Sequence, residues 1–123
     1  MVAVDISGRH TVNRRYLMVC AAVVVKISPE SIEKIYDMKL VPQVSESIDL
    51  DVVVTLIEKA VRGLSGVVIA EKGDLYNQER WKIECILSRQ FKYPESLGER
   101  RAIEFAHHAS FAGRNLMLDL LKR

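Results

Sequence analysis

The chain opens with hydrophobic and polar positions that alternate. Residues 2–7 switch between large apolar and small or polar side chains before Gly8, and this period of two predicts a strand. Residues 16–25 are apolar at every position, which is typical of a central strand buried on both faces. The link between them is either a long turn or a short strand around residues 9–12, closed by a turn at Asn13.

Further along, the apolar spacing changes to that of helices. Ser28–Pro29 offers a capping hydroxyl and a first-turn proline, and the spacing that follows predicts a helix to about Lys39. Residues 50–64 match i, i+3, i+4, i+7 through four turns and predict a second helix, after which residues 67–70 form a short buried strand. The remaining elements are a third helix capped by Asp74 or Asn77, an edge strand at residues 90–93 and a last helix over residues 96–121.

These elements predict a single α/β domain spanning residues 1–123. Repeats, low-complexity tracts and Pro/Gly-rich linkers are absent from the sequence. A right-handed crossover through residues 29–64 brings residues 67–70 parallel to residues 2–6. We therefore expect a mixed sheet, in which an antiparallel meander is continued by parallel strands, with helices on both faces.

Composition is that of one ordinary soluble domain, with 49% hydrophobic and 28% charged residues. The net charge of +2 is too small to imply a polyanionic partner by itself. The longest apolar run, residues 16–25, is about half of what a bilayer span needs, so we expect a cytoplasmic protein without a membrane partner. Cys20 and Cys85 fall outside zinc or Cys-x-x-Cys spacing, and we expect two buried thiols.

Asp5 is the residue hardest to explain by packing. A carboxylate inside an apolar strand loses its hydration, so it needs a metal ion, a hydrogen-bond donor or a solvent-filled cleft. The alternative is a turn-stabilising carboxylate bonded to the backbone of residues 7–9. We favour a site role for Asp5.

Two further carboxylates occupy informative positions. Glu71 follows the strand at residues 67–70, at the carboxyl end where open α/β sheets bind ligands. Glu99 lies in the first turn of the last helix on its sheet-facing side, where the alternative role is a capping box with Ser96. Converging carboxylates would hold Mg²⁺ or Mn²⁺. The sequence leaves open whether one of them is replaced as a ligand by Asp74, Glu104 or His107.

The sheet-facing side of the last helix is built from small residues. Ala102, Ala106, Ala109 and Gly113 recur there at helical spacing. This pattern predicts close packing of the helix on the sheet.

Candidate nucleic-acid contacts form two groups of arginines near the proposed carboxylates. If both groups border one cleft, they would bind phosphates; the alternative is an ordinary solvated surface. The groups are Arg9, Arg14 and Arg15 near the first strand, and Arg100 and Arg101 in the last helix.

Taken together, Asp5 within Val-Ala-Val-Asp-Ile-Ser-Gly, the following meander, Glu71 and Glu99 resemble the ribonuclease H-like superfamily, which includes Holliday-junction resolvases and transposase cores. The resemblance implies a five-stranded sheet of three antiparallel and two parallel strands, with these acids holding two Mg²⁺ ions for phosphodiester hydrolysis. Residues 29–47 would then insert an extra helix and loop after the meander. The Asp-Ile-Ser-Gly-Arg start and residues 99–108 also resemble a small uncharacterised family of archaeal proteins.

The resulting hypothesis is a divalent-metal-dependent nuclease or nucleic-acid-processing domain. Asp5, Glu71 and Glu99 are its expected catalytic and metal-binding residues, with Mg²⁺ or Mn²⁺ as the cofactor and nucleic acid as the partner. The alternative is a non-catalytic binding or scaffold module of the same fold, for which a homodimer is one form.

Overall fold

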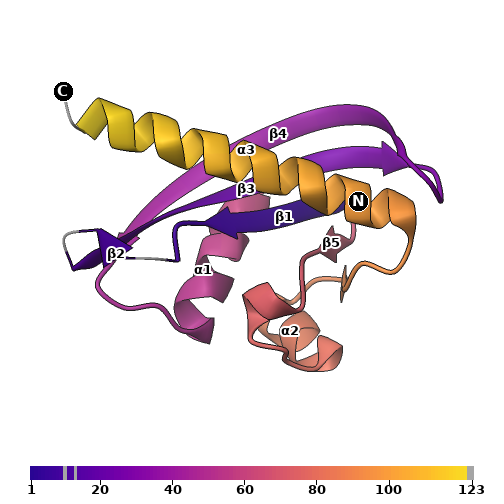
Figure 1. Ribbon diagram of the computed structural model, residues 1–123. Helices are drawn as coiled ribbons and strands as arrows, with labels where there is room; N and C mark the ends of the chain where they lie inside the picture. The colour runs from indigo at the N-terminus through magenta and orange to yellow at the C-terminus, as the bar shows by residue number, and fades with distance from the viewer. Residues whose placement is uncertain (10, 13, 122–123) are drawn as a thin grey trace.

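A mixed β-sheet forms the centre of the molecule (Figure 1). The computed structural model describes residues 1–9, 11–12 and 14–121. Its strands are β1 (Val2–Ser7), β2 (Thr11–Val12), β3 (Arg15–Ile27), β4 (Ile32–Ser45), β5 (Val68–Ile69) and β6 (Phe91–Lys92).

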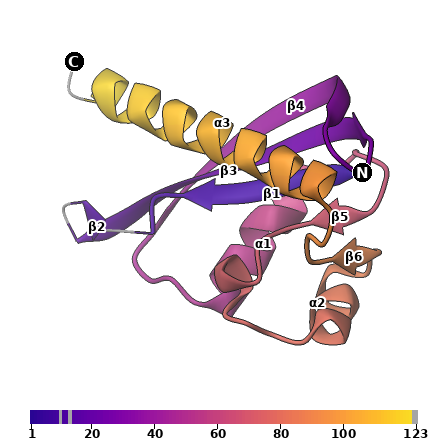
Figure 2. The ribbon, with the colours of Figure 1, turned by 45° about the vertical axis from the view of Figure 1, so that its right-hand side comes forward.

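Helices cover both faces of this sheet, as expected. The long helix α3 (Leu97–Leu121) crosses one face, and α1 (Leu50–Val61) lies on the other (Figures 1 and 2). Asp49 caps α1 by accepting a hydrogen bond from the Val52 N–H at 2.9 Å. The shorter helices η1 (Gly73–Leu75, a 3₁₀ turn) and α2 (Arg80–Leu87) follow β5.

The strand topology confirms the predicted mixed sheet. β1, β3 and β4 form the antiparallel meander, and β5 and β6 continue it on the other side of β1 as parallel strands. The two-residue β2 pairs with the start of β3, beyond the level at which β1 ends. Of the two alternatives for this link, the short strand is therefore correct, and the predicted turn at Asn13 lies outside the described residues.

The helix predicted from Pro29 to Lys39 is wrong, and so is the inserted helix and loop over residues 29–47. Residues 32–45 form β4, the third strand of the meander. Ser28 makes a turn rather than a helix cap, because its hydroxyl accepts hydrogen bonds from the Glu30 and Ser31 N–H groups at 3.2 and 3.0 Å.

Two apolar layers hold the fold together, one on each face of the sheet. The larger layer joins α1 and the segment around α2 to one face of β1 and β3. In the thinner layer, Ala102 and Ala106 of α3 pack on Ala3 and Ala21 of the sheet, and all four are fully buried. The predicted close packing through small residues is confirmed, and it brings the polar side chains of α3 close to β1.

The structure also bears on the expectations for the two cysteines, for the cap of the third helix and for membrane-spanning segments. Cys20 is buried, but Cys85 is exposed on α2. Asp74 belongs to η1, whereas α2 starts after Glu79, which makes no side-chain capping bond. Within the described ranges, every helix is too short or too polar to cross a membrane.

A testable consequence concerns Gly98, where α3 meets the β3–β4 turn. The Gly98 N–H donates to the Pro29 carbonyl at 3.0 Å, and a Cβ atom at Gly98 would lie 1.9 Å from the Ser28 carbonyl oxygen. We expect Gly98→Ala to destabilise the protein by about 2 kcal/mol or more, because backbone must move to admit the methyl group. Gly73→Ala is the matched control, since that position has open space around it. Equal urea midpoints for the two variants would contradict this packing.

Candidate carboxylate site beside strand β1

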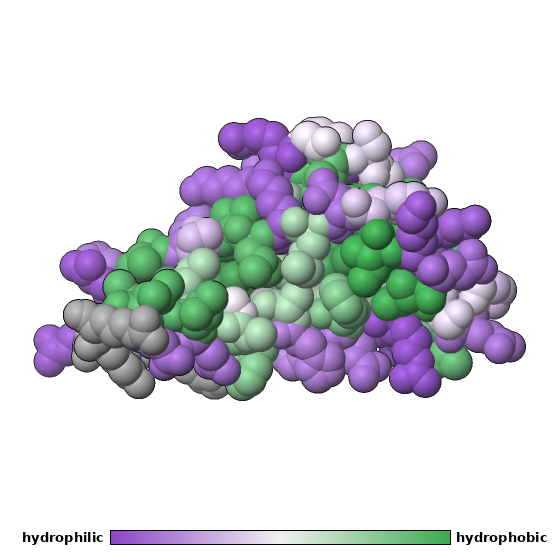
Figure 3. Space-filling model, turned by 90° about the horizontal axis from the view of Figure 1, so that it is seen from above, coloured by the Kyte–Doolittle hydropathy of each residue, from purple (hydrophilic) through white to green (hydrophobic). Residues whose placement is uncertain are grey.

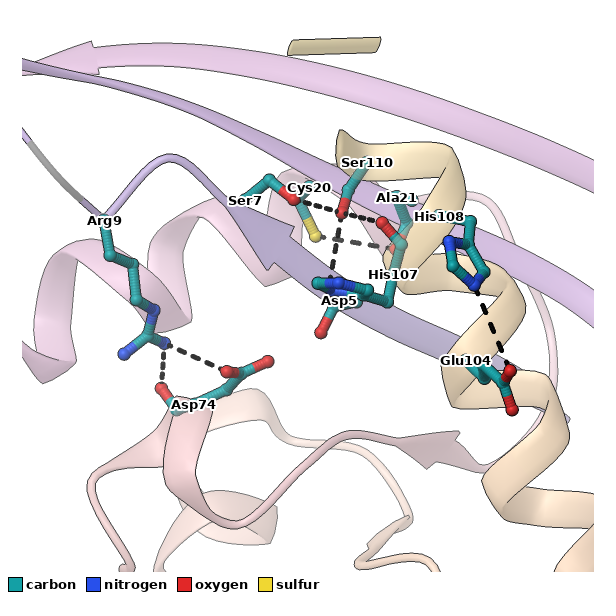
Figure 4. A network of polar contacts seen from close by, with 10 residues as sticks. All are labelled: Asp5, Ser7, Arg9, Cys20, Ala21, Asp74, Glu104, His107, His108 and Ser110. Carbon is teal, nitrogen blue, oxygen red and sulfur yellow. Dashed lines mark hydrogen bonds and ion pairs between the residues drawn. The ribbon is translucent and has the colours of Figure 1, made fainter. Parts of the chain in front are cut away.

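Asp5 lies in the middle of β1 and faces α3 (Figure 4). Its side chain is buried, and its register partner on β3 is Ala21. The carboxylate oxygen Oδ2 accepts a hydrogen bond from the Ser110 hydroxyl at 3.1 Å and lies 3.0 Å from His107 Nδ1. Helix α3 therefore supplies polar partners to a carboxylate that an all-apolar environment would strongly disfavour.

These partners connect the buried carboxylate to the surface. The Ser110 hydroxyl lies 2.7 Å from that of Ser7, so the polar network continues along β1. His107 and Ser110 are three residues apart and share one side of α3. The His107 side chain is 58% exposed, and its ring stacks on Phe111 with centroids 6.4 Å apart. His107 thus reaches from Asp5 to solvent.

Asp74 approaches Asp5 because β5 is very short. β5 pairs with β1 only at Val2 and Ala3, and the chain then turns through η1. Leu75 is fully buried and anchors this turn against the sheet. The position beside Asp5, which a longer β5 would cover, is occupied by the Asp74 side chain instead (Figure 4).

The two carboxyl groups interact strongly. Burial raises the pKa of Asp74, and repulsion from the Asp5 charge raises it further. The positive charge of Arg9 lowers this pKa, whereas a hydrogen bond to Asp5 and the negative charge of Glu71 raise it. The resulting pKa of Asp74 is about 7. Burial, with both carboxyl groups nearby, also raises the pKa of Cys20. The pair therefore retains a proton near neutral pH when no cation is bound.

Arg9 balances this pair only in part. Its Nη2 donates to the main-chain carbonyl of Asp74 and lies 3.9 Å from Asp74 Oδ1, while its guanidinium carbon lies 5.4 Å from the centre of the Tyr76 ring. Asp74 Oδ2 and Arg9 Nε are both buried, and neither has a hydrogen-bond partner among the described residues. A proton or a bound cation can satisfy such a carboxylate oxygen.

The three predicted acids do not converge in this structure. Glu71 follows β5 and is exposed, although its charge acts on Asp74. Glu99 precedes His107 by eight residues on α3, about 12 Å along the helix axis. The carboxylate that reaches Asp5 is Asp74, which the sequence left open as either a ligand or a helix cap.

Glu99 makes the capping box that was its alternative role. Its Oε1 accepts hydrogen bonds from the Ser96 and Glu95 N–H groups at 3.0 Å, and its own N–H donates to the Ser96 hydroxyl at 3.1 Å. Lys92 Nζ lies 2.8 Å from Oε2. Burial alone would raise the pKa of Glu99, but the hydrogen bonds and the charge of Lys92 lower it to about 2.

Of the five arginines predicted to bind nucleic acid, Arg9 contacts Asp74. Arg14 and Arg15 are exposed where the chain enters β3, and Arg100 is exposed in the first turn of α3. Arg101 pairs with Glu104, their charged atoms 3.6 Å apart. The two groups lie toward opposite ends of β1, so they do not line one cleft.

A cavity of about 310 Å³ opens beside His107. Its wall includes Arg114, which the sequence reasoning missed and whose Nε donates to the Leu17 carbonyl at 2.8 Å. Ser110 was missed as well. The available signal was helical spacing, since positions 107, 110 and 114 recur on one side of α3. The cavity is lined by Ile6, Ser7, Gly8, Arg9, His107, Phe111 and Arg114.

The site thus combines a buried carboxyl pair with a neighbouring basic and aromatic cavity. Across residues 1–9, 11–12 and 14–121, no three His, Cys, Asp or Glu side chains are already arranged around a common metal position. Two carboxylates from separate elements are nevertheless a usual core of a site for hard divalent cations, which complete their coordination with water and substrate oxygens.

The fold and this site define a small α/β protein with paired acids beside the central strand of a mixed sheet. Residues 2–118 match the family described as "Uncharacterized protein conserved in archaea (DUF2209)", and the chain belongs to that family. It is 28% identical over 121 residues to Uncharacterized protein MJ0095 of Methanocaldococcus jannaschii, with 96% of each chain covered. The expected archaeal family is confirmed. None of the solved structures matches the chain.

The raised pKa of Asp74 predicts how stability depends on pH. The folded protein holds this proton up to about pH 7, whereas the unfolded chain releases it near pH 4, so Asp74 makes stability decrease as pH rises between these values. We expect Asp74→Asn to raise the melting temperature of the metal-free protein at pH 8 and to have little effect at pH 4. The substitution removes a decrease in the free energy of unfolding of at most about 1.4 kcal/mol per pH unit. Glu46→Gln, at an exposed acid that is not among the groups acting on Asp74, is the control, and an equal response of both variants would refute the pairing.

The lowered pKa of Glu99 predicts the opposite dependence. Its contribution to stability is complete above about pH 4.5 and is lost as pH falls toward 2. We expect Glu99→Gln to reduce the free energy of unfolding by about 1–3 kcal/mol at pH 7, because the half-buried Lys92 loses its ionised partner. Denaturant titrations at pH 7 and pH 2.5 measure this difference. A deficit that persists unchanged at pH 2.5 would contradict the ionised capping box.

Proposed function

We propose that this protein is a ribonuclease H-like, divalent-metal-dependent nuclease domain that hydrolyses phosphodiesters, with Asp5 and Asp74 as the metal-binding pair. The observation that carries the proposal is the buried carboxyl pair, which leaves Asp74 Oδ2 without a hydrogen-bond donor among the described residues. Keeping two carboxyl groups together away from water is unfavourable unless one is protonated or a cation is bound, and groups perturbed in this way cluster at functional sites.

The order of the sheet supports the same proposal. β1 is central, with the antiparallel strands on one side and the parallel strands on the other, which is the arrangement that the sequence resemblance implied. One acid lies on β1 and the other follows the adjacent parallel strand. In this proposal Asp74 takes the role first expected of Glu71, and α3 contributes His107 to the site in place of Glu99.

The chain's own groups have distinct roles in the proposed reaction. Asp5 and Asp74 would hold Mg²⁺ or Mn²⁺, which supplies Lewis acidity to the phosphate and to the attacking water. His107 and Ser110 fix the Asp5 carboxylate through Oδ2, so it enters the reaction in one orientation. Arg9 and the adjacent cavity would bind the nucleic acid: the arginines contact phosphate, and exposed Phe111 offers a stacking surface for a base.

A non-catalytic binding or scaffold module remains the second candidate, because Arg9 already provides a cation near Asp74. In such a module, Arg9 and a retained proton would balance the carboxyl pair permanently. Added metal would then have no site to occupy.

Thermal melts with and without millimolar Mn²⁺ separate the two functions. For the nuclease we expect Mn²⁺ to raise the melting temperature by about 4 °C, since a ligand stabilises the state that binds it. Asp5→Asn and Asp74→Asn should abolish this increase. Glu99→Gln is the matched control, because it removes a buried carboxylate outside the pair, and its Mn²⁺-induced increase should equal that of the wild type.

Hydrolysis of branched and single-stranded DNA and RNA provides the second readout. The wild type should cleave at least one substrate only with Mg²⁺ or Mn²⁺, and Asp5→Asn should not. A wild-type melting temperature that is unchanged by millimolar Mn²⁺ would refute the metal site. Equal Mn²⁺ stabilisation of Asp74→Asn and the wild type would show that the pair is not the site.

A further inference from the structure

Strand β4 is a long edge strand with an exposed apolar side. It pairs with β3 along one edge, and in the described part of the chain no strand pairs with the other. Ile35, Met38, Leu40 and Val44 lie opposite β3 residues on the side of the sheet that faces α3, yet all four are exposed, up to 58% at Val44. Such edges promote pairing with another chain unless they are blocked.

Helix α3 extends this apolar surface. Its C-terminal part exposes Leu116, Leu120 and Leu121, and a cavity of about 340 Å³ between α3 and β4 is lined almost entirely by apolar side chains. The view onto this side of the molecule shows hydrophobic residues gathered in a band across it (Figure 3). The opposite side of β4 is mostly polar, so the strand is amphipathic with its apolar side uncovered.

The backbone of β4 can pair at its outer edge over a short, well-defined stretch. The Met38 N–H donates to the side chain of Asp37 at 2.8 Å, so it points away from β3. Strand alternation directs the N–H of Leu40 outward as well, and it places Pro42, which has no N–H, at the next outward position. At the other end, the register shift at Tyr36 interrupts the strand. The outer edge is therefore regular over residues 37–41, and Tyr36 lies directly next to this stretch.

We propose that β4 pairs with β4 of a second copy of this chain, antiparallel and about a two-fold axis at Met38. In this register Asp37 lies opposite the partner's Lys39 on both sides of the axis, giving two favourable cross-strand charge pairs. A shift of the axis by one residue places Asp37 opposite itself, or Lys39 opposite itself. The charge pattern therefore selects both the occupant of the edge and the register.

The neighbouring contacts fit this arrangement. Met38 meets the partner's Met38 within the regular stretch, and Leu40 meets the partner's Tyr36 at its margin, so the two apolar rows join on the α3 side of the sheet. On dimerisation the Met38 N–H would donate to a backbone carbonyl of the partner instead of to Asp37. The Asp37 carboxylate would then pair with the partner's Lys39. The Lys39 ammonium group donates to the carbonyls of Lys59 and Arg62 at 3.1 and 3.3 Å, at the end of α1 and on the same side of the sheet as Asp37.

Size-exclusion chromatography with light scattering on charge-reversal variants tests the dimer. The wild type should be a dimer at micromolar concentration. Asp37→Lys and Lys39→Asp should each weaken dimerisation at least about tenfold, because both cross-strand pairs become repulsive. Glu30→Lys is the control, since this exposed residue lies in the β3–β4 turn outside the paired stretch, and it should dimerise like the wild type.

Mixing provides the decisive result. Combined in equal amounts, the Asp37→Lys and Lys39→Asp chains should form a heterodimer, because each strand then carries the charges that the other lacks. Circular dichroism checks that both variants are folded. The proposal would be overturned by a wild type that is monomeric at roughly 100 µM, a concentration well above the micromolar Kd expected of the dimer. A wild-type-like dimer in either single variant, or a mixture that stays monomeric, would also overturn it.

Discussion

The burial of a carboxyl group at Asp5 is the constraint on which the arrangement of the other elements depends. A carboxylate inside a sheet must be hydrogen bonded, protonated or paired with a cation, and the chain meets this requirement from two distant segments. Helix α3 brings His107 and Ser110 to Oδ2, which requires the helix to lie close to the sheet. The small side chains beneath α3, such as Ala102 and Ala106, allow that approach.

The sequence predicted most of the elements, and its one large error has a physical cause. The helix was predicted from Ile32, Ile35 and Tyr36, which have helical spacing. In β4, Ile32 and Ile35 lie on the α3 side of the sheet, and Tyr36 is the extra residue at a register shift. Two register shifts, between Val24 and Val25 and between Lys26 and Ile27 of the neighbouring strand, each add an extra residue to β4. A strand with two bulges therefore imitates the pattern of a helix, and only its pairing with β3 distinguishes them.

The candidate site was predictable in part for a similar reason. Asp5 stood out because a charge interrupts an apolar alternation, a signal that needs no tertiary structure. Glu71 was the natural partner, since extending the pairing of Ala3 with Ile69 by two residues would place it beside Asp5. β5 ends at Ile69, however, and the following turn presents Asp74 instead. Where a two-residue strand stops depends on packing, which single-sequence patterns do not encode.

The contact between Arg9 and Asp74 bears on which proposed function the site performs. If Arg9 were a permanent internal counter-ion, the most favourable geometry would be a bidentate pair that satisfies both groups. The observed contact leaves Asp74 Oδ2 without a donor and Arg9 Nε without an acceptor among the described residues. A divalent cation, in place of the retained proton, would satisfy such a carboxylate oxygen, and a phosphate oxygen would satisfy the guanidinium N–H. The two unsatisfied atoms are thus complementary to the two charged components of a metal-dependent phosphodiester reaction, which favours the nuclease over the scaffold.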